Sequence, residues 1–392
     1  MSVSTAERAV LDKIDAAALV ELTRSLVQAT GQNPPGEEAA TVAVLGAAAA
    51  ELGLDACEMP VRPGRNNLRI TLPGQSGPGV LLLGHTDVVP VGEGWTKDPF
   101  GAAVKDGRIF GRGTSDMKGG LAAALSAMAA LRGAGLTGPV ELAALVDEEE
   151  TGAGIRAYVE SASAPFVGCI TAEPTDLQTV IGARGACYLR VEIHGTACHA
   201  GNPDNGANAI YGAAAVVVEI ERMHRELAQR PHPLLGAATW SVGQIDGGTS
   251  GSIVPAECVV IADRRLLPGE SIATVLGDVR DRVTALRLHD RGLTVDITMP
   301  MEMPAFETPA GSTLAATVDA ALTDAGGPRL APGGWTAACD GGFVARDLGV
   351  PVVVLGPGSV ATQAHRPDES VAIEELVVGA RAYALSALRL LG

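Results

Sequence analysis

No stretch of this sequence is apolar for long enough to cross a membrane. The longest apolar runs, such as residues 121–131, are rich in alanine and end well before the ~20 residues that a transmembrane helix needs. The first 15 residues mix acids and bases and lack the continuous apolar segment of a secretory signal. We therefore expect neither a membrane span nor export, and we predict a cytoplasmic protein.

Paired cysteines are also missing. The six cysteines lie far apart in mostly apolar surroundings, and none has the C-x-x-C spacing of a zinc or redox motif. We expect them to be reduced, as cytosolic cysteines usually are.

Basic residues form no cluster, and the formal net charge is -16. Nothing in the sequence would neutralise a run of phosphates, so a nucleic-acid partner is not expected. An anionic small molecule is compatible with this net charge, because one nearby arginine outweighs distant charges that salt screens. The sequence also lacks a Gly-x-Gly-x-x-Gly turn after an early strand, which argues against a dehydrogenase.

The order of predicted elements indicates two domains in 392 residues. Up to about residue 176, helical and strand-like segments alternate, which is typical of a mainly parallel sheet covered by helices. The clearest strands are 80–84, 140–147 and 168–172, and the clearest helix is 119–132. Near the end, a helix at 312–324, a strand at 351–355 and a helix at 372–391 would complete this sheet.

A different order occupies the middle of the chain. The predicted succession is strand 187–193, helix 207–229, strand 238–244, strand 256–266, helix 270–286 and strand 293–298. This is the β-α-β-β-α-β order of a ferredoxin-like α+β domain. We therefore predict an α/β domain formed by residues 1–184 and 299–392, with a second domain of residues 185–298 inserted into it.

His85 and Asp87 follow the predicted buried strand 80–84, at the end where α/β sheets present their sites. Side chains two residues apart share a face of a strand, and a histidine oriented by a carboxylate is typical of a zinc site. A histidine that is merely satisfied by a neighbouring aspartate explains the pair equally well.

Two acidic segments are further candidates. Asp116 lies in a glycine-rich loop before a helix, where it can be a ligand or, more simply, a helix cap. Residues 147–150, Asp-Glu-Glu-Glu, follow a buried strand. They can be a solvated first helical turn, or they can supply a metal ligand and a neighbouring general base.

Two more candidates lie further along the chain. Glu173 ends another predicted strand, and His365 precedes the last helix. With His85, Asp116 and Glu149 they make five oxygen and nitrogen ligands at the ends of strands of one sheet. Such a set suits two zinc ions with a bridging carboxylate.

These motifs, taken in order, resemble those of the dizinc aminoacylase and carboxypeptidase family. They are HTDVVP from His85, GTSDMKG from Gly113, DEE from Asp147, EPT from Glu173 and HRPDE from His365. The family includes acetylornithine deacetylase, succinyl-diaminopimelate desuccinylase and glutamate carboxypeptidase. The resemblance implies a zinc-peptidase catalytic domain whose inserted domain serves as a lid and for dimerisation.

The resemblance also implies a role for each residue of the site. Asp116 would bridge two zinc ions, of which one is completed by His85 and Glu173 and the other by Glu149 and His365. Asp87 would hold His85 in its tautomer, and Glu148 would be the general base. Three consecutive glutamates leave this register open by one residue. Aligning Gly154 with the glycine usual after the motif favours Glu148 as base.

Candidates for the substrate contacts lie mainly in the inserted domain. By resemblance, His199 would donate to the oxyanion across a dimer interface, although it can also be a surface loop histidine. Arg265 would bind the substrate carboxylate, because a planar guanidinium can donate two parallel hydrogen bonds to one carboxylate. Its neighbour Arg264 is predicted to face solvent. Ser252 stands where the family commonly has asparagine, and the Asp340 loop resembles one that lines the substrate pocket.

The sequence thus predicts a homodimeric amide hydrolase with two zinc ions, or cobalt or manganese in their place. The expected reaction is removal of an acyl group from an N-acyl amino acid in amino-acid biosynthesis. The expected type is acetylornithine deacetylase-like or succinyl-diaminopimelate desuccinylase-like. A dipeptidase or carboxypeptidase with the same metal site is the alternative. A non-catalytic binding protein is a further alternative.

Overall fold

The computed structural model describes residues 3–162 and 165–392. Two compact units are present. Unit 1 comprises Met1–Gly182, Glu307–Gly334 and Cys339–Gly392, and unit 2 comprises Ala183–Phe306 with Trp335–Ala338. Unit 2 continues beyond the predicted residue 298 because its last strand, β14, runs from Thr294 to Met303.

Unit 1 is built on a sheet of nine strands in the order β1-β2-β6-β3-β7-β17-β8-β15, with β16 paired to β8. The strands are β1 (Asp55–Arg62), β2 (Arg65–Leu72), β3 (Gly79–His85), β6 (Val140–Leu145), β7 (Phe166–Thr171), β8 (Val180–Ala183), β15 (Phe306–Glu307), β16 (Gly333–Trp335) and β17 (Val352–Val354). A smaller sheet contains β4 (Ala103–Lys105), β5 (Arg108–Phe110) and β18 (Ser370–Ala372).

The centre of the main sheet is parallel. Strands β6, β3, β7 and β17 pair in parallel, while β1 with β2, β2 with β6 and β17 with β8 are antiparallel. Every residue of β3 and β6 is buried, as expected for central strands covered on both faces. The predicted strands 80–84, 140–147 and 168–172 correspond to β3, β6 and β7, and the predicted mainly parallel α/β class is confirmed.

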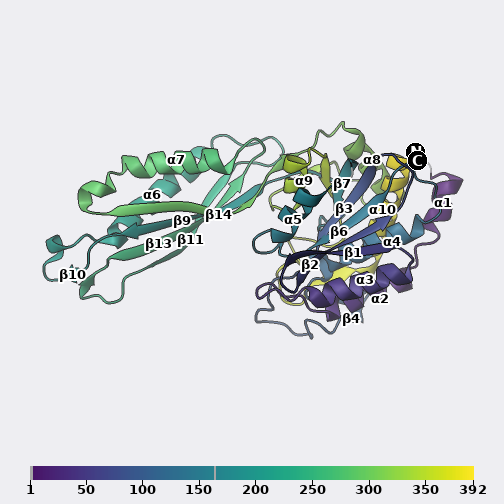
Figure 1. The fold of residues 1–392 in the computed structure, drawn as a ribbon, viewed down its shortest axis with the longest axis horizontal. Coiled ribbons are helices and arrows are strands. Elements are labelled where there is room, and N and C mark those ends of the chain that lie inside the picture. The colour runs from purple at the N-terminus through teal and green to yellow at the C-terminus, as the bar shows by residue number, and fades with distance from the viewer. Residues whose placement is uncertain (1–2, 163–164) are drawn as a thin grey trace. The chain divides into compact units, whose positions relative to one another are not determined.

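Helices cover both faces of this sheet (Figure 1). The helices of this unit are α1 (Thr5–Leu11), α2 (Ala16–Gln28), α3 (Ala39–Glu51), α4 (Gly119–Ala130), α5 (Ala153–Ser161), α8 (Thr313–Asp324), α9 (Gly341–Asp347) and α10 (Ile373–Leu391), with a short helical turn, η1 (Thr114–Lys118), before α4. Gly84 of β3 abuts Leu121 of α4 so closely that a side chain would clash, and Gly168 of β7 abuts Leu314 of α8 in the same way. Thr171, on the opposite face of β7, lies against the start of α9.

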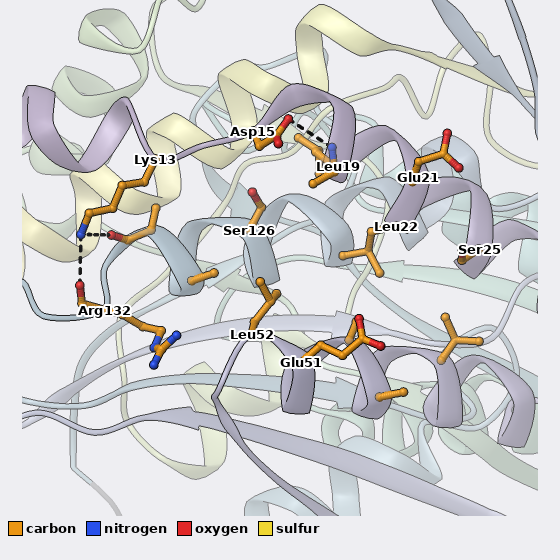
Figure 2. Close-up of a pocket in the computed structure, with 16 residues that line it drawn as sticks. Lys13, Asp15, Leu19, Glu21, Leu22, Ser25, Glu51, Leu52, Ser126 and Arg132 are labelled. Carbon is orange, nitrogen blue, oxygen red and sulfur yellow. Dashed lines mark hydrogen bonds between the residues drawn. The ribbon is translucent and has the colours of Figure 1, made fainter.

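A cavity of about 850 Å³ lies on the helical surface of unit 1. Figure 2 shows its lining, which comes from α2, α3 and α4 and has small side chains in its floor and Lys13, Glu21, Glu51 and Arg132 around it. The Lys13 ammonium donates to the carbonyls of Ala130 and Arg132 and so caps the end of α4. None of the candidate site residues lines this cavity.

The main sheet of unit 2 is antiparallel with the strand order β11-β13-β9-β14, and β10 and β12 form a second, two-stranded antiparallel sheet. Its elements are β9 (Gly185–His194), β10 (Cys198–His199), η2 (Pro203–Asn205), α6 (Ala209–Leu227), β11 (Thr239–Gly247), β12 (Ile253–Val254), β13 (Glu257–Leu266), α7 (Ile272–Ala285), η3 (Leu288–Arg291) and β14. The main elements follow the predicted β-α-β-β-α-β succession, and the antiparallel main sheet is confirmed.

Alternation along β13 explains why α6 and α7 cover a single face of that sheet. Cys258, Val260, Ala262, Arg264 and Leu266 are buried, whereas the residues between them are partly exposed. The apolar members of the buried set pack with apolar residues of both helices, such as Val216 of α6 and Val279 of α7, in one core. Side-chain caps start the helices, with Asn208 accepting from two amides of α6 and Ser271 from one of α7.

Within the described ranges, no helix combines the length and the apolar character that a membrane crossing demands. The six cysteines are free.

Candidate metal centre

Three neighbouring parallel strands end in polar side chains at one edge of the main sheet. His85 is the last residue of β3, and Glu173 lies two residues beyond β7. Residues 147–149 follow β6. The carboxyl ends of parallel strands meet at one edge, so residues far apart in the sequence come together here.

Two further side chains reach the same place from loops. Asp116 lies in η1, where its own φ and ψ are not helical. His365 lies between β17 and β18 with a φ of 63°, in the left-handed region that residues with a Cβ rarely adopt. Neither residue is held by a strand, so both depend on contacts from other segments.

Asp116 lies between the two histidines. Its Oδ1 is 3.2 Å from Nε2 of His85, and its Oδ2 is 3.3 Å from Nε2 of His365. Glu173 Oε1 is 3.5 Å from Nε2 of His85, and Glu149 Oε2 is 3.3 Å from Nε2 of His365. The five side chains form two groups, each with one histidine and one glutamate, and the groups share the two oxygens of Asp116.

Glu148 lies beside the first of these groups. Ligand-capable atoms of His85, Glu148 and Glu173 are all within 4.8 Å of one another, and Glu148 is buried. Glu149 instead belongs with His365. The two adjacent glutamates therefore point to different parts of the centre. This arrangement would suit a general base at Glu148, beside His85 and Glu173, and a metal ligand at Glu149, beside His365.

The pKa values of the centre depend on burial and on the charges of neighbouring residues. Hydrogen bonding with Asp116 and Glu149 raises the pKa of His365 to about 10. Burial opposes a charge on His85, but Glu173, Asp116 and Asp87 together raise its pKa well above the usual value. Burial also raises the pKa of Glu148 and Glu173, and neighbouring carboxylates raise it further. The acids therefore need cations beside them to ionise together.

Asp87 connects the histidine to the glutamates. Nδ1 of His85 faces the carbonyl oxygen of Asp87 at 3.0 Å, closer than the Asp87 carboxylate at 3.6 Å. A carbonyl only accepts, so Nδ1 carries the proton and Nε2 faces the centre. The Asp87 carboxylate accepts from the amides of Glu148 and Glu149 at 3.2 and 3.1 Å.

A buried brace supports this arrangement from behind. The side-chain amide of Asn33 donates to Asp87 and Asp147, and Arg65 pairs with Asp147 at 2.9 Å and with Glu38. The sequence identifies none of these four contacts. In the sequence, Asn33 begins the short segment Asn-Pro-Pro-Gly, which is typical of a loop and indicates no partner for it, and the acidic run at 147–150 is the one signal near the brace.

The donor set fits divalent cations. Carboxylate oxygens and imidazole nitrogens are ligands of zinc and related metals. Oε1 of Glu149 is buried and has no hydrogen-bond partner among the described residues, which a cation would remedy. The residues present therefore fit two cations that share Asp116.

Asp340 and Arg265, both predicted to contact substrate, have different surroundings. Asp340 is buried at the start of α9, and neither of its carboxylate oxygens has a hydrogen-bond partner within the described part of the chain. Its burial and other nearby acids raise its pKa to about 8. Arg265 belongs to unit 2 and is partly exposed, with its Nε 3.0 Å from Asp263.

The prediction that Arg264 faces solvent is wrong. Its side chain is buried, pairs with Glu270 at 2.6 Å and lies 5.5 Å from the ring centre of Trp240. It occupies the face of β13 that the helices cover, and Arg265 occupies the other. The apolar residues two and four positions before Arg264, Ala262 and Val260, were the signal for this.

His199 and Ser252 are neighbours in unit 2. His199 in β10 pairs with Ile253 in β12, and the carbonyl of Ser252 accepts from Ala200 at 2.9 Å. The His199 side chain is exposed, and its Nδ1 accepts from the amide of Gly201. That bond leaves Nε2 as the N–H donor of the neutral ring.

Comparison with known proteins gives one family and one fold. The model of peptidase family M20/M25/M40 matches residues 81–389. Aminopeptidase PepT from Bacillus cereus is similar with a TM-score of 0.78 and 23% identity, over 96% of this chain and 99% of that one. Human carnosine dipeptidase 1 gives 0.72 and 16%, over 98% and 99%. The YXEP protein of Bacillus subtilis, a dinuclear metal binding peptidase, gives 0.74 and 15%, over 96% and 98%.

Proposed function

The chain belongs to peptidase family M20/M25/M40, and from this premise we propose that it is a two-metal hydrolase of small peptides. The observation that carries the proposal is the position of Asp116, whose two oxygens face His85 and His365 separately. We propose His85, Asp116 and Glu173 as ligands of one cation, and Asp116, Glu149 and His365 as ligands of the other. We propose zinc as the metal, with cobalt or manganese as substitutes.

The substrate class follows from the relatives. The similar structures named above are peptidases by their names, which favours the alternative of a dipeptidase-like activity over removal of an acyl group. Deacylation of an N-acyl amino acid is the second candidate, since it breaks the same kind of bond beside a carboxylate. Two sequence segments, Asp340-Gly341-Gly342 and Gly356-Pro357-Gly358-Ser359, resemble loops of the deacetylase and desuccinylase branch of the family, and this resemblance supports the second candidate.

In the proposed reaction, cations held by these five side chains would supply polarisation of the amide carbonyl and a lowered pKa of the attacking water. Glu148 accepts a proton from the attacking water and passes it to the leaving amine, because it is a buried carboxylate next to His85 and Glu173. Asp87 keeps Nε2 of His85 directed at the centre. We further propose that His199 of unit 2 donates to the oxyanion and that Arg265 binds the substrate carboxylate, with Ser252 and Asp340 as further substrate contacts.

We also propose a homodimer formed through unit 2, in keeping with a lid and dimerisation role for that unit. Tyr211 and Val218 on α6 are 64% and 62% exposed, and Ile245 on the edge strand β11 is 54% exposed. Apolar side chains beside an unpaired strand edge favour association with a second copy. Val218→Glu should yield a monomer in light scattering, and a wild type that is monomeric at all concentrations would refute the dimer. We also propose a cytoplasmic location.

The test is a metal analysis combined with a hydrolysis screen. Purified protein should hold close to two divalent ions per chain, and Asp116→Ala should hold neither tightly. The screen compares dipeptides and tripeptides with acetyl, succinyl and formyl amino acids, each with zinc, cobalt or manganese added. Hydrolysis of N-acyl amino acids but not of peptides would replace the proposed substrate class by the second candidate. Full activity after complete removal of metal would refute the two-metal hydrolase.

A further inference from the structure

A buried ion pair lies behind the metal centre. Arg112 and Glu369 are 2% and 1% exposed, and Nη1 of Arg112 is 2.8 Å from Oε2 of Glu369. The guanidinium also lies 5.2 Å from the ring centre of Trp95. An ion pair that is almost completely shielded from solvent is costly to bury, and removal of one partner leaves an uncompensated charge. A role in the neighbouring centre would explain why the protein keeps this costly pair.

The second carboxylate oxygen of Glu369 holds the backbone at the shared ligand. Oε1 accepts from the amides of Ser115 and Asp116 at 2.8 and 3.1 Å. The backbone carbonyl of Glu369 accepts from Gly111 at 2.8 Å. The loop from 111 to 116 is thus attached to Glu369 at three amides, and the direction of the Asp116 side chain depends on them.

Arg112 holds the other loop. The same Nη1 donates to the carbonyl of Arg366 at 3.3 Å, next to His365. The His365 side chain is 53% exposed, so its packing alone fixes it poorly. By contrast, His85 is part of β3 and Glu173 closely follows β7, so the sheet fixes that half of the centre.

We propose that Arg112 and Glu369 are positioning residues that fix the cation position formed by Asp116, Glu149 and His365. This inference rests on the proposed two-metal function. The pair joins the loops of two of the three ligands, while the position at His85 and Glu173 has its own support. Loss of the pair should weaken cation binding at Asp116, Glu149 and His365 much more than cation binding at His85 and Glu173. Replacement of a residue that orients a metal ligand typically lowers the affinity for the metal about 10- to 100-fold.

The experiment measures zinc and cobalt binding by equilibrium dialysis, with the visible spectrum of bound cobalt as a second readout. Wild type, Glu369→Ala and Glu369→Gln are compared. Glutamine can still accept from the two amides but offers Arg112 no charge. We expect Glu369→Ala to keep one tight ion and to bind the other about 10- to 100-fold more weakly, with Glu369→Gln in between. The cobalt spectrum should lose the component of one ion.

The matched control is Glu7→Ala. Glu7 pairs with Arg389 at 2.6 Å in the same unit, both are largely buried, and neither contacts a candidate ligand. This variant should lose stability and keep both ions. Arg112→Lys, which keeps the charge but not the fork, serves if Glu369→Ala does not fold, and it should weaken one ion only.

The outcomes separate the inference from the proposed function. A wild type with fewer than two ions refutes the two-metal function itself. If the wild type binds two ions and the Glu369 variants bind both ions as tightly as the wild type does, the positioning role is refuted. Equal weakening of both ions, or the same effect in Glu7→Ala, also refutes it, because a general loss of structure would then suffice.

Discussion

The side-chain amide of Asn33 donates to Asp87 Oδ2 at 2.9 Å and to Asp147 Oδ1 at 3.1 Å. One amide thereby joins the residue that supports His85 to the residue that precedes Glu148. Asp147 itself has a φ of 67°, a backbone conformation that is unfavourable for a residue with a Cβ. Its carboxylate needs several donors to hold it, and Arg65, at 2.9 Å, is the nearer and more buried of its two arginine partners.

Replacement of Arg65 by methionine should strongly destabilise the protein. The change leaves the buried Glu38 carboxylate without its arginine and takes from Asp147 the nearer of two, and the loss of a buried partner typically costs about 3 to 5 kcal/mol. Denaturation by urea of the metal-free protein measures this. Arg62→Met is the control, because Arg62 lies 3.5 Å from the same aspartate but is half exposed, and should cost about 1 kcal/mol or less. Equal losses of unfolding free energy in the two variants would contradict a special role of Arg65 in holding Glu38 and Asp147.

Glu148→Gln should abolish most of the activity without loss of metal. Glutamine is nearly the same size but cannot accept a proton, and a positioned general base typically contributes about 10²- to 10⁴-fold to the rate. Steady-state kinetics and metal analysis of the same preparation provide the measurement. Glu150→Gln, an exposed neighbour in the same run, should behave as wild type. Near-normal turnover of Glu148→Gln would transfer the role of base to another residue.

Metal binding should release protons at neutral pH. Without metal, the carboxylates around His85 and His365 raise the pKa of both histidines, that of His365 to about 10, so both rings are protonated at pH 7. A cation needs the neutral ring, so binding must displace these protons and affinity must fall as the pH falls. Calorimetry in buffers of different ionisation enthalpy should find at least two protons released per two ions. Binding that is independent of pH between 6 and 8 would contradict this.

The positions of the candidate ligands were predictable because a parallel sheet brings together what lies at the ends of its strands. His85 and Glu173 follow buried runs, and the acidic residues after β6 follow a third. The order of these motifs along the chain added the loop residues Asp116 and His365. The geometry of the Asp116 oxygens was beyond the sequence, since it depends on side-chain directions.

The supporting residues were not predictable for a physical reason. Asn33 and Asp87 are 54 positions apart, and Glu369 is 253 positions from the amide of Asp116. Local spacing carries no information on such pairs. Glu369 is the last residue of the HRPDE motif, so it was visible in the sequence without a role. Arg264 shows the opposite case, in which a charged residue was assigned to solvent although its apolar neighbours on the same face indicated burial.

Arg264 and Arg265 offer a final comparison between adjacent residues. Arg264→Met should destabilise unit 2 by about 2 to 4 kcal/mol, because Glu270 loses its buried partner and the guanidinium its place by Trp240. Arg265→Met removes a partly exposed pair and should cost about 1 kcal/mol or less. If Arg265 binds the substrate carboxylate, its loss should instead raise KM about 10- to 100-fold, as expected for two charge-assisted hydrogen bonds. Thermal unfolding and kinetics of both variants provide the readouts, and an unchanged KM in Arg265→Met would remove that residue from the substrate site.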